Sequence, residues 1–317
     1  MSSAFRLLLG ARERMYAAGF FRTMRLNHPV VSVGNLTVGG TGKTPLAIAL
    51  AERFLKEGFR PVILSRGYKR SSRGILIVSR GDGPIVPWHE AGDEPFLIAR
   101  RVKGAAVVVG AHRFEAGQLA EREDLGNLFI LDDGFQHRKL FRDVDIVTVD
   151  PAEWAEGEKL LPVGRWREPK AAIGRAHAAC VQEKEGIPAP SLPIPAFSVQ
   201  TRFDAIYKGC DAIDAKSLRN KPVVAFAGIA KPERFFKALK NLNLTPARTI
   251  AFRDHHSFTT EDIAEISKPG THEIPITTEK DAIRLEGTGM GDFLHLRISA
   301  NIPEFDRLME LIRSRFS

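Results

Sequence analysis

The sequence carries one glycine-rich segment that ends in a lysine and a hydroxyl side chain. Residues 34–45 read GNLTVGGTGKTP and contain the Gly-Lys-Thr core of a phosphate-binding loop at Gly42, Lys43 and Thr44. Glycines let backbone N–H groups curl around phosphate oxygens, the lysine reaches the β- and γ-phosphates, and the threonine hydroxyl can bind Mg²⁺. The segment predicts nucleotide binding, and the alternative is a purely structural glycine loop. The expected nucleotide contacts are Thr37, which stands where the usual pattern has its first glycine, with Gly39, Gly40, Thr41, Gly42, Lys43 and Thr44.

A second chemical feature is a pair of acids that follows an apolar run. Residues 127–137 read NLFILDDGFQH, so Asp132 and Asp133 stand directly after a strand-like segment. Carboxylates at the carboxyl end of a parallel strand lie where ligands bind, and near a phosphate loop such an acid can hold the metal. The alternative is a simple turn, which Asp-Asp-Gly forms readily.

The surrounding pattern alternates short apolar runs with helical periodicity. Strands are expected at residues 29–34, 61–64, 75–78, 105–109, 128–131, 145–149 and 223–228, and helices at 45–58, 94–103, 112–123 and 233–241. Nearly continuous Val/Ile/Leu strands that alternate with helices predict an α/β fold, with a parallel sheet covered on both faces. The proline-rich stretch at residues 186–195 marks a boundary. We therefore expect a P-loop domain over residues 1–192 and a smaller α/β domain over 193–317.

Composition limits the partners. The 317 residues include 46 Lys and Arg against 38 Asp and Glu, a net charge of +8, which favours a polyanionic partner such as a phosphorylated substrate or an acidic membrane surface. No basic and aromatic stripe of the kind that binds single strands is present, so we expect no nucleic acid partner. The two cysteines, Cys180 and Cys210, cannot build a disulfide framework or a four-thiolate zinc site, which fits a reducing compartment.

The first 28 residues are basic and contain apolar side chains at helical spacing. They hold five arginines and one glutamate, and Phe5, Leu8, Leu9, Met15, Gly19 and Phe20 fall roughly on one stripe. Such a helix can lie in an anionic membrane interface, and the alternative is a helix packed on the domain surface. The scattered arginines argue against a cleaved secretory signal, and no apolar run is long enough to span a bilayer.

Eight segments together resemble the tetraacyldisaccharide 4′-kinase family, the lipid A 4′-kinases. They are GNLTVGGTGKTP, LSRGY (64–68), GDEP (92–95), LDDGFQH (131–137), LLPVGRWREP (160–169), FAGIAKPERF (226–235), DHHSF (254–258) and TTEKDAIRL (277–285). The resemblance implies ATP and Mg²⁺ as cofactors and phosphorylation of the 4′-hydroxyl of an acylated glucosamine disaccharide 1-phosphate, giving lipid IVA. It also implies two α/β/α domains joined by a two-stranded linker, here near residues 195–207 and 293–302. Its members work at the cytoplasmic face of a Gram-negative inner membrane, where we expect this chain as a peripheral monomer.

The resemblance also implies roles for individual residues. Asp93 of GDEP corresponds to the base that receives the hydroxyl proton, and His255 of DHHSF to its partner. Without the resemblance, Asp93 reads as the N-cap of a helix beginning at Glu94, and His255 as a loop histidine. We expect Thr44, Asp132 and Asp133 to hold the metal, with Glu168 as a further contributor. The expected substrate contacts are Arg66, Arg113, Arg165 and Glu168. Guanidinium groups suit phosphate, so these three arginines, together with Arg167, are candidates to bind phosphate on ATP or on the lipid.

Two rival functions are a P-loop GTPase and a non-catalytic, nucleotide-dependent membrane adaptor; another small-molecule kinase is a third alternative. A GTPase needs an Asn-Lys-x-Asp motif, and the sequence Asn220-Lys-Pro-Val223 lacks the final aspartate. The acids and the Asp–His candidates argue against an adaptor.

Overall fold

The computed structural model describes residues 2–209, 211–267, 272–286 and 293–316, which form two compact units. The first unit runs to Thr201 and takes up the chain again from Ala300, and the second is Arg202–Ser299. The boundary therefore differs from the one expected at residues 192 and 193. Strand β8 (Ala196–Lys208) begins within the sheet of the first unit, and the C-terminal helix α10 (Phe305–Arg313) packs against α2 (Lys43–Lys56). Arg53 lies 2.5 Å from Asp306 and Arg313 lies 2.8 Å from Glu57 in that contact.

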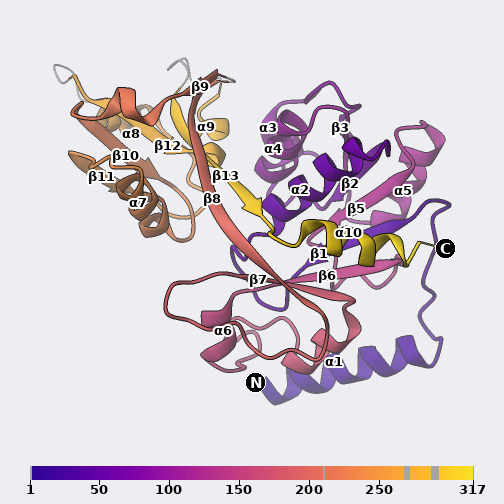
Figure 1. Ribbon diagram of the computed structural model, residues 1–317. Coiled ribbons are helices and arrows are strands. Elements are labelled where there is room, and N and C mark those ends of the chain that lie inside the picture. Colours follow the sequence, from indigo (N-terminus) through magenta and orange to yellow (C-terminus); the bar gives the residue numbers. More distant parts are fainter. Residues whose placement is uncertain (1, 210, 268–271, 287–292, 317) are drawn as a thin grey trace. The chain divides into compact units, whose positions relative to one another are not determined.

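The first unit is built on a mostly parallel sheet in the order β8-β7-β6-β1-β5-β2-β4-β3 (Figure 1). Its further strands are β1 (Val30–Gly34), β2 (Pro61–Ser65), β3 (Leu76–Ser79), β4 (Ala106–Val109), β5 (Leu128–Asp132), β6 (Val144–Val149) and β7 (Ala178–Gln182). Only β3 runs antiparallel to its neighbour, β4, among the described pairs of this unit. β1, β2, β4, β5, β6 and β7 are buried along their whole length, as expected for a parallel sheet covered on both faces.

Helices cover both faces of this sheet. Alternate strand residues point to opposite sides, and because these residues are apolar on both sides, both faces must be buried. Val62, Leu64, Phe129 and Leu131 form one apolar cluster with Ala116 and Ala120 of α5 (Arg113–Arg122). Helix α2 lies against β1, β2 and β5, and α4 (Asp93–Arg101) lies against β3 and β4. The remaining helical segments of the unit are α1 (Ser2–Ala17), α3 (Trp88–Ala91), α6 (Pro151–Ala155) and the 3₁₀ turn η1 (Lys170–Arg175).

The second unit repeats the three-layer plan on a smaller scale. Strands β11 (Arg248–Ala251), β10 (Val223–Ala227), β12 (Ile274–Thr278) and β13 (Leu294–Asn301) are parallel neighbours in that order, and β9 (Asp211–Ile213) pairs with β8. Helix α7 (Pro232–Asn241) packs on one face through Phe235 and Leu239, and α8 (Thr260–Ile266) on the other through Ile263 and Ile266. The unit also contains α9 (Glu279–Arg284) and η2 (Ala215–Leu218).

These observations confirm the predicted fold class, including the linker: β8 and β13 carry the chain between the units. Strand β7 was not among the predicted strands, and it contains Cys180, whose thiol is buried so that its pKa rises to about 12. Cys210 lies outside the described residues. No helix in the described part of the chain is long and apolar enough to cross a bilayer.

The N-terminal helix α1 does not carry its apolar residues on one stripe. Phe5 and Leu9 pack against an apolar cluster of the first unit that includes Phe135 and Trp166, whereas Leu8 and Met15 are exposed. Gly19 and Phe20 follow the end of the helix. The single stripe expected from the sequence is therefore wrong, because α1 has one apolar face toward the protein and a second toward solvent.

Candidate active site

The candidate site residues of the first unit gather at one edge of its sheet. The parallel strands β1, β5, β2 and β4 end there at Gly34, Asp132, Ser65 and Val109. The pairing sets Val33 beside Asp132 and Leu64 beside Leu131, so the segments that follow these strands start next to each other. Those segments are the glycine-rich loop (residues 34–44), the acidic segment (residues 132–137), Arg66 and the turn before α5. This edge is where open parallel sheets bind their ligands.

The glycine-rich loop has glycine at two positions where the backbone is left-handed and other side chains come close. Gly39 and Gly42 both have positive φ, 124° and 83°. A Cβ at Gly39 would lie 2.2 Å from Nη2 of Arg165, and one at Gly42 would lie 2.6 Å from Nε2 of Gln182. Helix α2 begins directly after Gly42, two residues before the start at Pro45 that the sequence indicated, so Lys43 and Thr44 stand in its first turn. Backbone N–H groups and the positive end of the helix dipole therefore meet at this loop.

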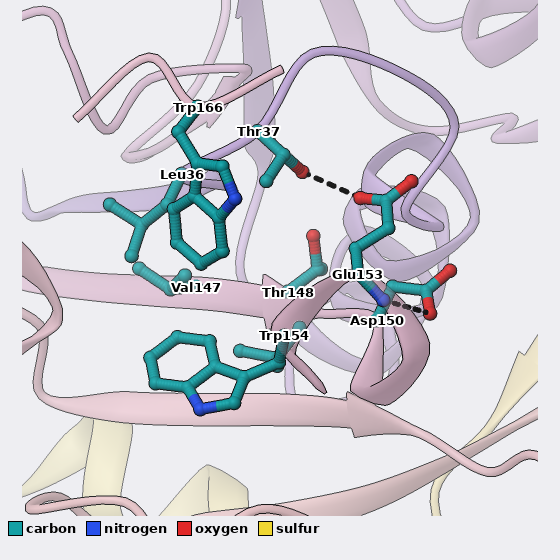
Figure 2. Close-up of a pocket in the computed structure, with 9 residues that line it drawn as sticks. Leu36, Thr37, Val147, Thr148, Asp150, Glu153, Trp154 and Trp166 are labelled. Atoms are coloured by element: carbon teal, nitrogen blue, oxygen red, sulfur yellow. Dashed lines mark hydrogen bonds between the residues drawn. The ribbon is translucent and has the colours of Figure 1, made fainter. Parts of the chain in front are cut away.

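Two threonines of the loop turn their side chains into the protein. The hydroxyl of Thr37 donates a hydrogen bond to Glu153 at 2.9 Å (Figure 2). The hydroxyl of Thr41 accepts from Nδ2 of Asn35 at 2.9 Å and shares a 2.8 Å hydrogen bond with Thr148. Thr37 thus has a structural use that glycine could not supply. The hydroxyls of both threonines are engaged within the protein, and the N–H of Thr41 also donates to the carbonyl of Gly39 at 3.1 Å.

The segment around Trp166 pairs with the loop and braces it. The N–H of Val38 donates to the carbonyl of Arg165 at 2.8 Å, and the N–H of Arg167 donates to the carbonyl of Leu36 at 2.7 Å. The Arg165 guanidinium donates to the carbonyl of Val38 at 2.8 Å and lies 3.3 Å from Glu153. Arg165, expected to contact substrate, is therefore placed beside the loop and engaged with its backbone.

Asp133 is the centre of a charge cluster at the strand ends. Its carboxylate accepts two hydrogen bonds from Arg167, at 2.8 and 2.9 Å, and lies 3.7 Å from Nζ of Lys43. Burial alone would raise the pKa of this carboxyl, but the positive charges of Lys43 and Arg167 outweigh it and the pKa is lowered. Asp133 is thus held ionised beside the loop lysine. Asp132 is buried at the end of β5, next to Val33.

The other predicted substrate contacts have different surroundings. Arg113 is buried and donates to the carbonyl of Gly110 at 2.8 Å. Burial and the nearby charge of Arg66 lower its pKa to about 10, against the opposing effect of Asp132 and Asp133, so it remains a cation at neutral pH. Arg66 is exposed at the end of β2.

Glu168 is buried in an ion pair. Its carboxylate lies 2.7 Å from Nη2 of Arg175, and the Arg175 guanidinium stacks 4.7 Å from the ring centre of Phe135. Glu168 therefore forms an ion pair within the protein, whatever contact it makes with a ligand.

Asp93 is buried at the start of α4. The helix begins at Asp93 itself and its N-cap is Gly92, so the interpretation of Asp93 as the N-cap of a helix from Glu94 is wrong. Its Oδ1 accepts a hydrogen bond from the N–H of Glu94 at 3.0 Å. Gly92 has φ 90°, and a Cβ there would lie 3.3 Å from Cα of Gly67, which shows that the GDEP and LSRGY segments meet.

His255 belongs to the second unit and follows β11 (Arg248–Ala251). Its backbone is left-handed, with φ 59°, and Nδ1 lies 3.2 Å from Nη2 of Arg284. His256 instead lies 2.7 Å from the Asp262 carboxylate and stacks on Phe252 at 4.7 Å, so it is part of the packing around α8. A pair between Asp93 and His255 would join the two units and stays a prediction.

The sequence did not single out three side chains that shape the loop. Glu153 binds Thr37, Gln182 lies against Gly42, and Arg167, considered only as one of several arginines, binds Asp133. Glu153 follows β6 and Gln182 ends β7, so the rule that ligand sites lie at carboxyl ends of parallel strands could have pointed to both.

A glycine-rich loop between a parallel strand and a helix, beside acids at a neighbouring strand end, defines a nucleotide-binding type of α/β protein. A family model described as tetraacyldisaccharide-1-P 4′-kinase matches residues 1–317, so the chain belongs to that family. The family identified from the sequence motifs is confirmed, and it decides in favour of a kinase over a GTPase or an adaptor.

Individual relatives agree with this family. The tetraacyldisaccharide 4′-kinase of Aquifex aeolicus is 38% identical over 313 residues, covering 98% of this chain and 96% of the relative. That of Pelobacter propionicus is 38% identical over 295 residues, covering 90% and 82%. A crystal structure of the "apo" form of LpxK from Aquifex aeolicus in complex with ATP matches with a TM-score of 0.87 and 36% identity, covering 100% of this chain and 97% of that one.

His137, the last residue of the acidic segment, makes stability depend on pH. Burial, followed by the charges of Arg113 and Arg142, lowers its pKa from 6.5 to about 4. As pH falls from about 6.5 to 4, the unfolded chain binds a proton that the folded chain does not, so His137 costs stability across that range. We expect the melting temperature of His137→Gln to rise relative to wild type as pH falls from 7 to 4. An exposed histidine, changed in His89→Gln, serves as the control; parallel curves for His137→Gln and wild type would contradict the assignment.

Proposed function

We propose that this protein transfers the γ-phosphoryl group of ATP to the 4′-hydroxyl of a tetraacylated glucosamine disaccharide 1-phosphate, which yields lipid IVA. The observation that carries the proposal is the loop lysine beside an ionised acid, with Lys43 and Asp133 3.7 Å apart, in a chain of this family. Phosphoryl transfer depends mainly on positioning and on stabilising the charge of the transferring group. The positive charges at the strand edge of the first unit could serve both to position the phosphates and to stabilise their charge.

In this proposal the backbone of residues 37–44 binds the β- and γ-phosphates and Lys43 neutralises their charge. Mg²⁺ fits the donors available: the hydroxyl of Thr44 and the carboxylates of Asp132 and Asp133 are hard oxygens, and Mg²⁺ on a nucleotide needs only one or two carboxylates besides phosphate. When bound, the ion neutralises charge on the β- and γ-oxygens. Arg66, Arg113 and Arg165 are proposed to face the phosphates of ATP or of the lipid, and Glu168 is proposed to contact the substrate.

Asp93 is proposed to accept the proton of the 4′-hydroxyl as its oxygen attacks the γ-phosphorus and ADP leaves. The carboxylate stands in the first turn of α4, where the helix dipole favours its ionised form. His255 is proposed to orient this carboxylate and to take part in moving its proton. The two residues belong to different units, so the proposed pair draws one residue from each.

Membrane association is proposed through the outer face of α1. Leu7 and Leu8, with Phe20 just beyond the helix, are 74%, 69% and 79% exposed. The inner face is anchored: Arg12 donates to the carbonyl of Gln136 at 2.6 Å, and Glu13 pairs with Arg138 and Arg175 at 2.6 and 3.2 Å. An anchored helix with exposed Leu and Phe beside arginines suits an anionic interface. We propose a peripheral monomer at the cytoplasmic face of the inner membrane.

The reaction is tested by mass spectrometry of the lipid after incubation with MgATP. We expect one added phosphate on the distal glucosamine of the tetraacylated disaccharide 1-phosphate. A product phosphorylated elsewhere, or ATP turnover that does not depend on the acylated disaccharide, would overturn the proposed reaction.

Lys43→Ala and Thr44→Ala are expected to nearly abolish turnover, because charge stabilisation supplies most of the rate in phosphoryl transfer. Lys56→Ala is the matched control, since it removes a lysine from the exposed end of the same helix. The measurement is kcat/KM for ATP with saturating lipid. If Lys43→Ala keeps more than about a tenth of wild-type activity, only ~1.4 kcal/mol of barrier, the loop does not bind the transferred phosphate.

Asp93 and His255 are expected to behave as one unit. In that case the Asp93→Ala/His255→Ala enzyme is scarcely slower than the slower single variant, because coupled catalytic residues are strongly non-additive. The measurement is kcat for the four enzymes of the cycle, with His256→Ala as control. Losses that multiply in full would show that the two residues act independently.

Replacing Leu7, Leu8 and Phe20 with serine is expected to weaken binding to anionic liposomes and to raise KM for the lipid, leaving KM for ATP unchanged. Deleting residues 2–25 is less specific, because it also removes Phe5, Leu9 and the Glu13 ion pairs from the domain surface. Ile85→Ser, also at an exposed apolar residue of the first unit, is the control. Co-sedimentation over a salt series measures the effect. Equal binding by the triple variant and wild type would mean that α1 serves only to pack on the domain.

A further inference from the structure

Three of the sequence motifs meet around His255 inside the second unit. Gly228 comes from FAGIAKPERF, His255 from DHHSF, and Asp281 and Arg284 from TTEKDAIRL. We call these four residues the His255 clamp. Asp281 and Arg284 are buried, with 0% and 5% exposure, although they are a charged pair. Burying two charges is costly unless geometry and further hydrogen bonds compensate, so the contacts of this buried pair show what it is used for.

The hydrogen bonds of the pair hold it against Gly228, Thr278 and His255. Arg284 Nη1 donates to Asp281 Oδ1 at 2.9 Å and to the carbonyl of Gly228 at 2.9 Å. Asp281 Oδ2 accepts from the N–H of Gly228 at 3.0 Å and from the hydroxyl of Thr278 at 2.7 Å. Arg284 Nη2 then lies 3.2 Å from Nδ1 of His255. The guanidinium is thus fixed on one side and presents its remaining edge to the imidazole.

The backbone of His255 is held by the same clamp. Its φ of 59° is left-handed, a conformation that is strained for a non-glycine residue and persists only where its surroundings impose it. The N–H of His255 donates to the carbonyl of Gly228 at 3.0 Å, the same oxygen that accepts from Arg284. A Cβ at Gly228 would lie 3.1 Å from Cβ of His256 and 3.2 Å from Asp281 Oδ1, so the absence of a side chain there permits this close approach.

We infer that Arg284 is a positioning residue that fixes the tautomer of His255, with Asp281 and Gly228 holding Arg284 in place. A guanidinium has only donors, and a neutral imidazole has one donor and one acceptor nitrogen. Nδ1 therefore accepts from Arg284, and the proton lies on Nε2. Nε2 lies 4.0 Å from the Asp254 carboxylate, an environment that also favours a proton there. The clamp thus presents an N–H from Nε2, the group that can donate to a carboxylate.

The inference rests on the proposed function, because it assigns His255 the task of donating to Asp93. It explains why DHHSF, FAGIAKPERF and TTEKDAIRL, which lie up to about 50 residues apart in the chain, serve one side chain. With Nδ1 protonated instead, Nε2 would be an acceptor and could not donate to an ionised aspartate.

The first measurement is ¹⁵N NMR of the full-length protein labelled in histidine, with His255 assigned by comparison with His255→Ala. We expect Nε2 to carry the proton in the wild type and Nδ1 to become protonated in a substantial fraction of Arg284→Met molecules. Because Arg284→Met leaves Asp281 buried without its partner, the paired variant Asp281→Asn/Arg284→Met is made as well; it removes both charges. Arg248→Met is the matched control, since Arg248 pairs with Glu273 in the same unit at 2.7 Å.

The second measurement is kinetic. We expect kcat to fall about 10- to 100-fold in the Arg284 variants, with KM for ATP nearly unchanged, because a displaced or wrongly protonated partner affects the chemical step. In a His255→Ala background the Arg284 change should cost nothing further, whereas a merely structural role would lower kcat again. Arg248→Met should change neither the tautomer nor kcat.

The outcomes separate this inference from the proposed function. If His255→Ala is slow but Arg284→Met and the paired variant keep both the Nε2 tautomer and kcat, the clamp has no positioning role and the kinase proposal stands. A proton on Nδ1 in the wild type would overturn the inference directly. If His255→Ala is as fast as the wild type, the role proposed for His255 fails, and the inference fails with it.

Discussion

The register between β1 and β5 is the constraint on which the site of the first unit depends. It sets Val33 beside Asp132, so the glycine-rich loop and the acidic segment leave the sheet at the same level. A slip of one residue would exchange the two faces of a buried strand, which the core does not tolerate. Close packing then fixes the two segments against each other: a Cβ at Gly34 would lie only 2.4 Å from that of Phe135. Because these segments pack closely against each other, Lys43 and Asp133 are held near each other.

Charge explains how this edge can receive a polyanion. Lys43 and Arg167 hold one ionised acid between them, and Arg113 and Arg66 add positive charge nearby. Such cations repel each other, which is one reason why the pKa of Arg113 is lowered. Phosphate oxygens would relieve that repulsion. Part of the net charge of +8 is therefore concentrated at this edge, where it would attract a polyanion. The arginines of α1 contribute separately, on a helix whose inner face is already bound to the domain.

The two units use buried charge differently. In the first, the ion pairs of Asp133 at the strand edge are partly exposed. In the second, Asp281 and Arg284 are enclosed and their hydrogen bonds end on Gly228, Thr278 and His255. Burial raises the pKa of the Asp281 carboxyl even though Arg284 opposes this, which shows how strongly the pair is desolvated. A pair of this kind is suited to positioning a neighbour rather than to binding and releasing one.

The sequence by itself determined the fold class, the glycine-rich loop, the acidic strand end and the family, because these depend on local periodicity and on residues close together in the chain. The predicted first residues of two helices were wrong. Helix α2 begins at Lys43 and α4 at Asp93, because the N-cap of each is a glycine with positive φ that stands directly before these residues. Only the tertiary structure decided what braces the loop and what faces His255. Glu153 is 116 residues from Thr37, and Arg284 is 29 residues from His255. Such contacts arise when strands and helices pack, and nothing in the spacing of either residue records its partner. Packing likewise decided which face of α1 lies against the protein, because Leu, Phe and Arg residues occur on more than one side of this helix.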